Sequence, residues 1–351
     1  MSFRMKSLVS GCALALLAGL AHAQDLAPLN SDTEKDRIDW SQLQAKFGDV
    51  PAAAAGTKIG GVSKTLTNEY WRSLGEGYQN AAKKAGVEVV YQAASSEGDQ
   101  LGQLSIAETL ISQGFSALLF SPQTDNNLQP ALESAQSKGI PVINVNDAVI
   151  PSAAHYVGNV QRDNGVRVAK WFLANRPQGG KVAVIEGQAG VFAAGQRTKG
   201  FAETVTEGGK FTVVASVPGN WDRQLAYDSA ATILQQNPDL VGFYANNDGM
   251  ALGVVEAVKA AGLQDKVVVF GTDGISDAYK SIKAGELTGT VDSFPVLTGE
   301  VGLEVALRLL GKQPLPRVVS TPQALITKDN VDTFSATGDA LRTVLLAQPA
   351  N

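Results

Sequence analysis

The feature that most constrains the fold is a regular alternation of apolar runs and amphipathic stretches, which begins near Gly56. The amphipathic stretches repeat at helical spacing, as Leu297, Val301, Val305 and Leu309 do. The apolar runs are short and continuous, which is typical of strands buried on both faces of a parallel sheet. These runs are IGGV, VEVVY, SALLF, IPVINV, VAVIEG, FTVVA, VGFYA and VVVFG.

This repetition of strand and helix predicts an α/β protein. The chain has 351 residues, which at roughly 150 residues per domain corresponds to about two domains. We therefore expect two lobes, each with its own parallel sheet. Residues 24–55 are charged and irregular, and we expect them to form an N-terminal extension that packs on the first lobe through Trp40.

The first 23 residues are typical of a cleavable export signal. MSFRMK supplies positive charge, SLVSGCALALLAGL is apolar, and Ala21-His22-Ala23 is a small-x-small cleavage site. An uncleaved membrane anchor is disfavoured, because the apolar run is shorter than the roughly 20 residues that span a bilayer. A lipoprotein cleavage before Cys12 is also disfavoured, since it would leave most of the apolar run on the mature chain. We expect a periplasmic protein that begins at residue 24.

Composition excludes several classes of function. Once the signal is removed, the chain has no cysteine and one histidine, His155, which we expect to be structural. This leaves no Cys/His zinc site and no cysteine nucleophile, and we expect no metal, no cofactor and no catalytic residues. The chain carries 29 Lys and Arg residues against 34 Asp and Glu residues, for a net charge of −5. An acidic protein of this kind is a poor match for nucleic acid.

Polar residues gather directly after the apolar runs. In open parallel sheets ligands bind beyond the carboxyl ends of the strands, so these residues mark a candidate crevice. We expect Asp248 to cap the helix that follows it and Glu186 to be structural, whereas Asp273 serves either the ligand or the local turn. The residues after the runs are Ser63-Lys64, Asn146-Asp147, Glu186-Gly187, Asn246-Asn247-Asp248 and Thr272-Asp273-Gly274.

Aromatic residues near the same ends indicate the chemistry of the ligand. Tyr70 and Trp71 follow Asn68 at the start of the first helix, and Trp221 lies in the polar loop VPGNWDR. Flat rings beside hydrogen-bonding groups suit a sugar, whose C–H faces stack on aromatic side chains. By contrast, we expect Trp171, within VAKWFLAN, to be a core residue.

The charged candidates balance one another. Lys64 and Arg197 only donate hydrogen bonds, and Asp273 only accepts them. Asp147, next to Asn146, adds a second acidic group. A site for an anionic ligand would contain more cationic than acidic side chains, and these residues show no such excess. A neutral polyhydroxy compound therefore fits best.

Several long stretches carry a resemblance to a known family. From about Lys58 to Lys328 the chain resembles periplasmic sugar-binding proteins of ABC importers, of the ribose and D-allose type. The stretches are KTLTNEYW, SSEGDQLGQL, VIEGQAG with GQRTKGF, PGNWDRQLAYDSA, YANNDGMALG and FGTDGISDA. The resemblance implies sugar contacts from Lys64, Asn68, Tyr70 and Trp71 in the first lobe, and from Arg197, Trp221, Asn247 and Asp273 in the second.

Two candidate positions depart from the pattern of that family. Asn146 stands where these proteins usually have Asp, and Ser293 stands where they usually have Gln near the hinge. The loss of an acidic acceptor and of a long amide favours a different sugar stereochemistry or an open-chain sugar alcohol.

The resemblance also implies the architecture and the partners. It implies two doubly wound parallel-sheet lobes that close on the ligand about a hinge with three crossovers, near Gln161, Ser293 and Gln323. The first lobe would comprise residues 56–160 and 294–322, the second residues 161–293 and 323–340, and a tail residues 341–351. The implied partners are a sugar or sugar alcohol and an ABC permease with its ATPase, and we expect a monomer.

Two other functions fit the sequence poorly, and a third fits it with the same fold. An NAD-linked or sugar-modifying enzyme is disfavoured, because no G-x-G-x-x-G follows the first strand and no phosphate-binding loop is present. A transcriptional repressor with this core would need a basic helix-turn-helix in place of the export signal. A carrier that mainly presents its ligand to a chemoreceptor remains an alternative with the same fold.

Overall fold

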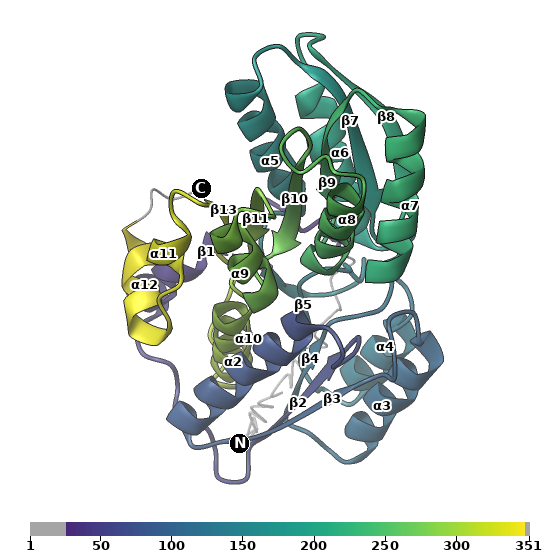
Figure 1. Cartoon of the computed structure of the whole chain (residues 1–351). Coiled ribbons are helices and arrows are strands. Elements are labelled where there is room, and N and C mark those ends of the chain that lie inside the picture. The colour runs from purple at the N-terminus through teal and green to yellow at the C-terminus, as the bar shows by residue number, and fades with distance from the viewer. Residues whose placement is uncertain (1–25, 348–351) are drawn as a thin grey trace, which may run out of the picture.

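The computed structural model describes residues 26–347, and the chain forms an α/β structure with two sheets. Figure 1 shows two lobes, one above the other, each with helices on both sides of its sheet. This confirms the predicted fold class. The predicted export signal and Cys12 lie outside the described residues.

The first sheet has seven strands, all parallel, in the order β1-β12-β6-β5-β4-β2-β3. It is covered by α2 (Glu69–Ala85), α3 (Gln100–Ser112), α4 (Gln129–Ser137) and α10 (Pro295–Leu310). Its strands are β1 (Arg37–Asp39), β2 (Lys58–Ser63), β3 (Glu88–Ala93), β4 (Ala117–Phe120), β5 (Val142–Val145), β6 (His155–Gly158) and β12 (Val318–Ser320).

The second sheet has six strands in the order β13-β11-β10-β9-β7-β8, and only β13 runs antiparallel to its neighbour. Its strands are β7 (Gly180–Glu186), β8 (Phe211–Pro218), β9 (Leu240–Ala245), β10 (Val268–Asp273), β11 (Gly289–Asp292) and β13 (Ala324–Thr327). Its helices are α5 (Gln161–Asn175), α6 (Phe192–Val205), α7 (Arg223–Gln236), α8 (Asp248–Ala260) and α9 (Ser276–Ala284).

The continuous apolar runs form the central strands of both sheets. Every residue of β4, β5 and β10 is buried. This burial on both faces is the reason that these strands read as unbroken apolar segments rather than as alternating ones. Trp171 of α5, predicted to lie in the core, is half-buried and packs against Phe270 with ring centroids 4.7 Å apart.

The chain passes between the sheets three times. It crosses from the first sheet to the second between β6 and β7, returns between β11 and β12, and crosses again between β12 and β13. Gln161 is the first residue of α5, Ser293 directly follows β11, and Gln323 directly precedes β13. Phe294, next to Ser293, has a left-handed backbone with φ 48°.

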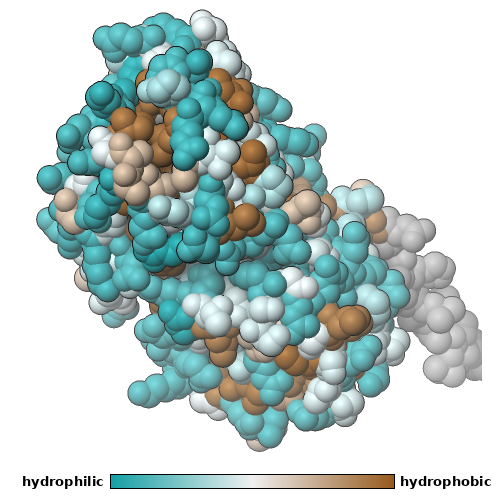
Figure 2. Space-filling model, turned by 45° about the vertical axis from the view of Figure 1, so that its right-hand side comes forward, coloured by the Kyte–Doolittle hydropathy of each residue, from teal (hydrophilic) through white to brown (hydrophobic). Residues whose placement is uncertain are grey.

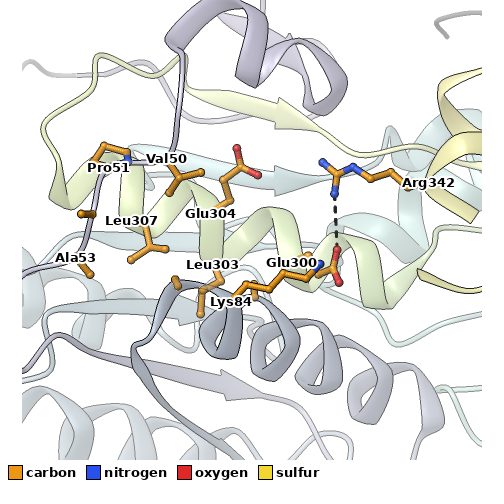
Figure 3. A pocket seen from close by; sticks show the side chains of 12 residues that line it. Val50, Pro51, Ala53, Lys84, Glu300, Leu303, Glu304, Leu307 and Arg342 are labelled. Atoms are coloured by element: carbon orange, nitrogen blue, oxygen red, sulfur yellow. Dashed lines mark ion pairs between the residues drawn. The ribbon is translucent and has the colours of Figure 1, made fainter. Parts of the chain in front are cut away.

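The two terminal segments meet beside α10. The N-terminal segment forms β1, which the sequence did not predict, then a 3-10 helix (Trp40–Gln42) and α1 (Leu43–Phe47). The C-terminal segment forms α11 (Val331–Phe334) and α12 (Gly338–Leu346). Arg342 of α12 lies 4.9 Å above the ring of Trp40 and 3.8 Å from Glu300 of α10. Figure 3 shows this ion pair at one end of a groove between α10 and α2 that has an empty volume of about 780 Å³.

A buried carboxyl group fixes the backbone where β11 leads into the crossover. Asp292 Oδ1 accepts a hydrogen bond from the Phe294 amide at 2.6 Å, and Asp292 Oδ2 accepts one from the Tyr279 hydroxyl at 2.7 Å. Burial raises the pKa of Asp292 to about 8, because removal from water disfavours the charged carboxylate.

Asp292→Asn should therefore flatten the pH dependence of stability. The folded protein keeps a proton on Asp292 that the unfolded chain, with a pKa near 3.8, releases. The free energy of unfolding should fall as the pH rises from about 4 to about 8, by up to about 1.4 kcal/mol per pH unit from this group. Asparagine stays neutral and still accepts from the Phe294 amide. Urea unfolding of both proteins between pH 5 and pH 8 measures the difference, and parallel pH profiles would show that Asp292 does not contribute.

Candidate ligand-binding site

A small cavity lies between the two lobes, where the carboxyl ends of both sheets face each other. Its empty volume is about 250 Å³, and it opens into an outer cleft of about 1060 Å³. Figure 2 shows a face on which the surface is hollowed between the lobes and is mainly hydrophilic. The cavity is lined by Asn68, Tyr70, Trp71, Glu97, Asn146, Asp147, Arg197, Trp221, Asn247 and Asp273.

Nearly all of the predicted site residues meet in this cavity. Of the predicted set, only Lys64 and Ser293 are not among its lining residues. Both are buried directly behind it: Lys64 pairs with Asp147, and Ser293 lies close enough to the Tyr70 hydroxyl to oppose the rise that burial causes in the pKa of Tyr70. The strands therefore bring together side chains that are more than 200 positions apart in the sequence.

The start of α2, in the first lobe, presents two aromatic rings to the cavity. Asn68 is the N-cap of α2, and its side chain accepts a hydrogen bond from the Tyr70 amide at 3.0 Å. Tyr70 and Trp71 then stand edge to face, with ring centroids 4.8 Å apart and planes at 85°. The Trp71 indole donates to Glu97 Oε1 at 3.1 Å. The cap thus fixes where the helix starts and how both rings are directed.

Asn146 joins the two lobes through a hydrogen-bonded chain. It follows β5 and has φ 50°, in the left-handed region that Asn tolerates. Its Nδ2 donates to the Tyr70 hydroxyl, and its Oδ1 accepts from Gln161 Nε2 at 2.6 Å. Gln161 Oε1 accepts in turn from Arg197 Nε at 3.0 Å. These hydrogen bonds connect α2 to the start of α5, and the start of α5 to α6.

Buried charges of opposite sign pair around the cavity, and one of these contacts, between Arg197 and Asp147, crosses from lobe to lobe. Lys64 Nζ forms an ion pair with Asp147 Oδ2. Arg197 Nη1 lies 3.6 Å from Asp273 Oδ1, and Arg197 Nη2 lies 4.0 Å from Asp147 Oδ1. The two cations are therefore engaged with carboxylates of the protein itself, one from each sheet. Pairing of this kind is required, because an unpaired buried ion costs several kcal/mol.

Asp273 occupies an unusual backbone conformation at the end of β10. Its φ is 135°, a region that residues with a side chain rarely adopt. Burial raises the pKa of Asp273 well above its usual value, while Arg197 opposes that rise. The loop is held by Asp248, whose Oδ2 accepts from the amides of Gly274 at 2.8 Å and Ile275 at 3.1 Å.

The prediction that Asp248 caps its helix is wrong. The N-cap of α8 is Asn247, whose Oδ1 accepts from the Met250 amide at 2.9 Å. Asp248 is the first helical residue and turns inward, where it also accepts from the Thr290 hydroxyl at 2.6 Å. Both Asn and Asp suit an N-cap, and the local sequence does not distinguish them.

Trp221 covers the cavity from the second lobe. It follows β8 in a loop with φ 66°, and 9% of the residue is exposed. Its ring lies directly on Gly187, where an added Cβ would come within 2.0 Å of the ring carbon Cη2. Its Nε1 is enclosed and has no hydrogen-bond partner among residues 26–347. Lys64 Nζ lies 5.4 Å from this ring and 5.7 Å from the ring of Trp71.

Two residues of the site were missed in the sequence. Gln161 was expected only to mark a crossover, but it connects Asn146 with Arg197. Glu97 lies in the loop after β3, and burial raises its pKa. The rule that polar residues following an apolar run line the crevice would have found Glu97, because VEVVY is such a run and the loop SSEGD follows it closely.

Two further observations concern metals and membranes. Within the described part of the chain, no group of three or more His, Cys, Asp or Glu residues is arranged to hold a metal ion. Between residues 26 and 347 no helix has the length and apolar character needed to cross a membrane.

His155 lies on β6, half-buried, with Nδ1 3.3 Å from the carbonyl oxygen of Pro316.

A polar cavity walled by aromatic rings, between the facing carboxyl ends of two sheets joined by three crossovers, defines a two-lobed ligand-binding protein. The family described as periplasmic binding protein domain matches residues 59–314, and the chain belongs to this family. It is accordingly a solute-binding protein rather than an enzyme, as predicted. The resemblance to sugar-binding proteins of ABC importers is confirmed.

Individual relatives match most of the chain. The D-allose-binding periplasmic protein of Escherichia coli is 36% identical over 263 residues, which cover 72% of this chain and 85% of that protein. The xylitol-binding protein of Mycolicibacterium smegmatis is 30% identical over 311 residues, covering 83% and 88%. A solute-binding protein of Actinobacillus succinogenes, solved with bound D-allose, superposes with a TM-score of 0.76 at 31% identity, covering 79% of this chain and 99% of that one.

Gly187→Ala should displace the Trp221 ring. The new methyl group would lie 2.0–2.4 Å from three ring carbons, so the indole must move or the strand must shift. We expect a loss of about 1–3 kcal/mol in the free energy of unfolding and a changed tryptophan emission spectrum. Gly195→Ala is the matched control, because no atom lies within 4 Å of its added Cβ. Equal effects of the two substitutions on stability and emission would contradict this packing.

Proposed function

We propose that the protein is the periplasmic solute-binding component of an ABC importer and that it captures a neutral monosaccharide or sugar alcohol. The observation that carries this proposal is the lining of the cavity, in which hydrogen-bonding side chains alternate with tryptophan rings. The proposed ligand contacts are Asn68, Tyr70, Trp71, Asn146, Asp147, Arg197, Trp221, Asn247 and Asp273, together with Lys64 and Ser293, which lie behind the lining and would be reached only if it rearranges. The names of the relatives support the same ligand class, since they include binding proteins for D-allose and xylitol.

The charge of the cavity favours a neutral ligand. Lys64 and Arg197 are paired with Asp147 and Asp273, so neither cation is left over for an anionic ligand. A polyhydroxy compound both donates and accepts, and it can bind these paired groups without breaking the pairs. The rings of Trp71 and Trp221 offer apolar faces for its C–H groups.

Direct contacts across the cleft support a mechanism in which two lobes close on the ligand. Asp125 Oδ1, before α4, accepts from the Phe192 amide of α6 at 3.0 Å. Glu69 Oε1, at the start of α2, accepts from the Ser276 amide of α9 at 2.8 Å. A ligand that touches both lobes stabilises this closed arrangement because it binds the open one less well.

We propose that the lobes comprise residues 56–160 with 294–322 and residues 161–293 with 323–340, preceded by the extension 24–55 and followed by a tail. In the closed state the outer surfaces of both lobes take a single relative orientation. A permease with its ATPase would recognise that orientation, which links ligand capture to import. We also propose that residues 1–23 direct the protein to the periplasm and are removed there.

A thermal-shift screen followed by calorimetric titration tests the proposed function. The panel comprises D-allose, D-ribose, xylitol and other aldoses and alditols, with D-gluconate as an anionic comparison. A ligand at 100 times its Kd should stabilise the protein by about 2.7 kcal/mol. We expect saturable binding of at least one neutral member. Binding of the anion alone, or turnover of any sugar, would overturn the proposal.

Trp221→Ala should weaken binding at least about 30-fold, because the ring supplies apolar contact area worth about 2 kcal/mol. Because its Nε1 makes no hydrogen bond within the described chain, the unliganded protein loses the packing of the ring and its contact with the Lys64 ammonium, but no hydrogen bond. Trp221→Phe is the matched control and should bind with intermediate affinity. A large fall in the melting temperature without ligand, with affinity preserved, would instead mark Trp221 as a structural residue.

A further inference from the structure

Glu97 has one carboxylate oxygen that the protein does not use. It lies in the loop between β3 and α3 and lines both the inner cavity and the outer cleft. Oε1 accepts a hydrogen bond from the Trp71 indole at 3.1 Å. Oε2 is enclosed, with less than 1 Å² exposed, and has no hydrogen-bond partner in the described chain. Glu97 thus places an unsatisfied acceptor at the point where the cavity opens into the cleft.

No neighbouring side chain accounts for this oxygen. The ammonium group of Lys64 is close enough to lower the pKa of Glu97, but it forms its ion pair with Asp147. The Asn68 side chain also lowers that pKa, but it forms no hydrogen bond with Oε2. The larger effect is burial, which raises the pKa of Glu97.

A purely structural role for Glu97 would need only one of its two oxygens. An amide oxygen could accept the hydrogen bond of the Trp71 indole equally well, without the cost of enclosing a carboxylate. Leaving an enclosed acceptor without a partner costs free energy in the unliganded protein. A ligand with a hydroxyl that donates to Oε2 removes this unfavourable contribution, whereas a ligand without such a donor leaves it in place.

We propose that Glu97 is a specificity-determining residue of the ligand site: Oε1 positions the Trp71 ring, and Oε2 accepts a hydrogen bond from a ligand hydroxyl at the mouth of the cavity. This inference rests on the proposed function. A site built around an enclosed acceptor rejects analogues that lack the matching hydroxyl far more strongly than a hydrophobic pocket rejects a missing methylene group. Glu97 would therefore select among sugars and alditols by the hydroxyl that they carry at this end.

Glu97→Gln tests the proposal in the full-length mature protein. The amide oxygen of glutamine can keep the bond from the Trp71 indole, whereas its NH₂ group places a donor where the cavity held an acceptor. Calorimetry should show about 10- to 100-fold weaker binding of whichever of D-allose, D-ribose or xylitol the wild-type protein binds most tightly. Without ligand, the melting temperature should be equal to or higher than that of the wild type. Unchanged affinity would overturn the proposal.

A second background separates ligand contact from positioning of the ring. Trp71→Phe keeps an aromatic face but removes the indole N–H that Glu97 holds. If Glu97 acts only through Trp71, Glu97→Gln should have no further effect in this background, and that result would overturn the ligand contact. If Oε2 binds the ligand, the loss of affinity should persist.

Monodeoxy analogues of the bound sugar or alditol identify the hydroxyl. Wild-type protein and Glu97→Gln should bind one analogue with equal affinity, namely the one that lacks the partner of Oε2. If every analogue keeps the full difference between the two proteins, the proposal fails. Failure of the wild-type protein to bind any sugar or alditol would overturn the proposed function itself, so the two failures are distinguishable.

Discussion

The structure of the cleft depends on burying charges of both signs between two sheets without leaving any cation unpaired. Arg197 comes from α6, yet it lies within 4.0 Å of two carboxylates, one just after β5 in the first lobe and one at the end of β10 in the second. Moving a single ion from water into such a site costs several kcal/mol, so each buried group makes its neighbours necessary. The relative position of the lobes is thereby tied to the charge pattern, since Asp147 of the first lobe meets Arg197 of the second only when the cleft is narrow.

The backbone around the cavity is strained at four residues. Asn146, Asp147, Trp221 and Asp273 all have positive φ values, and all four line the site. Such conformations are unfavourable for residues with a side chain and persist only where surrounding contacts impose them. Here those contacts are the hydrogen bonds of Asp248 to the loop after β10 and of Asn146 to Tyr70 and Gln161. Strain is thus concentrated at the carboxyl ends of the strands, where side chains must turn into the cleft.

The sequence predicted most of the fold and most of the residues that line the cavity, for a physical reason. Strands buried on both faces must be continuously apolar, so the polar residues that follow them stand out, as Asn146 and Asp273 do. The features that the sequence did not predict depend on contacts between segments that lie far apart in the sequence. β1 is three residues long and exists because it pairs with β12 at the sheet edge, and the role of Gln161 depends on side chains from both lobes. The choice of Asn247 over Asp248 as helix cap was decided by Gly274 and Thr290, which lie more than 20 positions away.

The substitution of asparagine for the usual acid at position 146 can be explained by its partners. Its amide donates to the Tyr70 hydroxyl and accepts from Gln161, so both of its polar groups are engaged within the protein. A carboxylate could accept from both neighbours but could donate to neither, and it would add a charge that Arg197, shared between Asp147 and Asp273, is poorly placed to balance. Asn146 therefore connects the lobes in addition to lining the cavity. The groups available to discriminate among the proposed ligands are those that the protein leaves unsatisfied within the described chain, such as Trp221 Nε1. The proposed specificity therefore rests on the aromatic walls and the mouth of the cavity rather than on its hinge side.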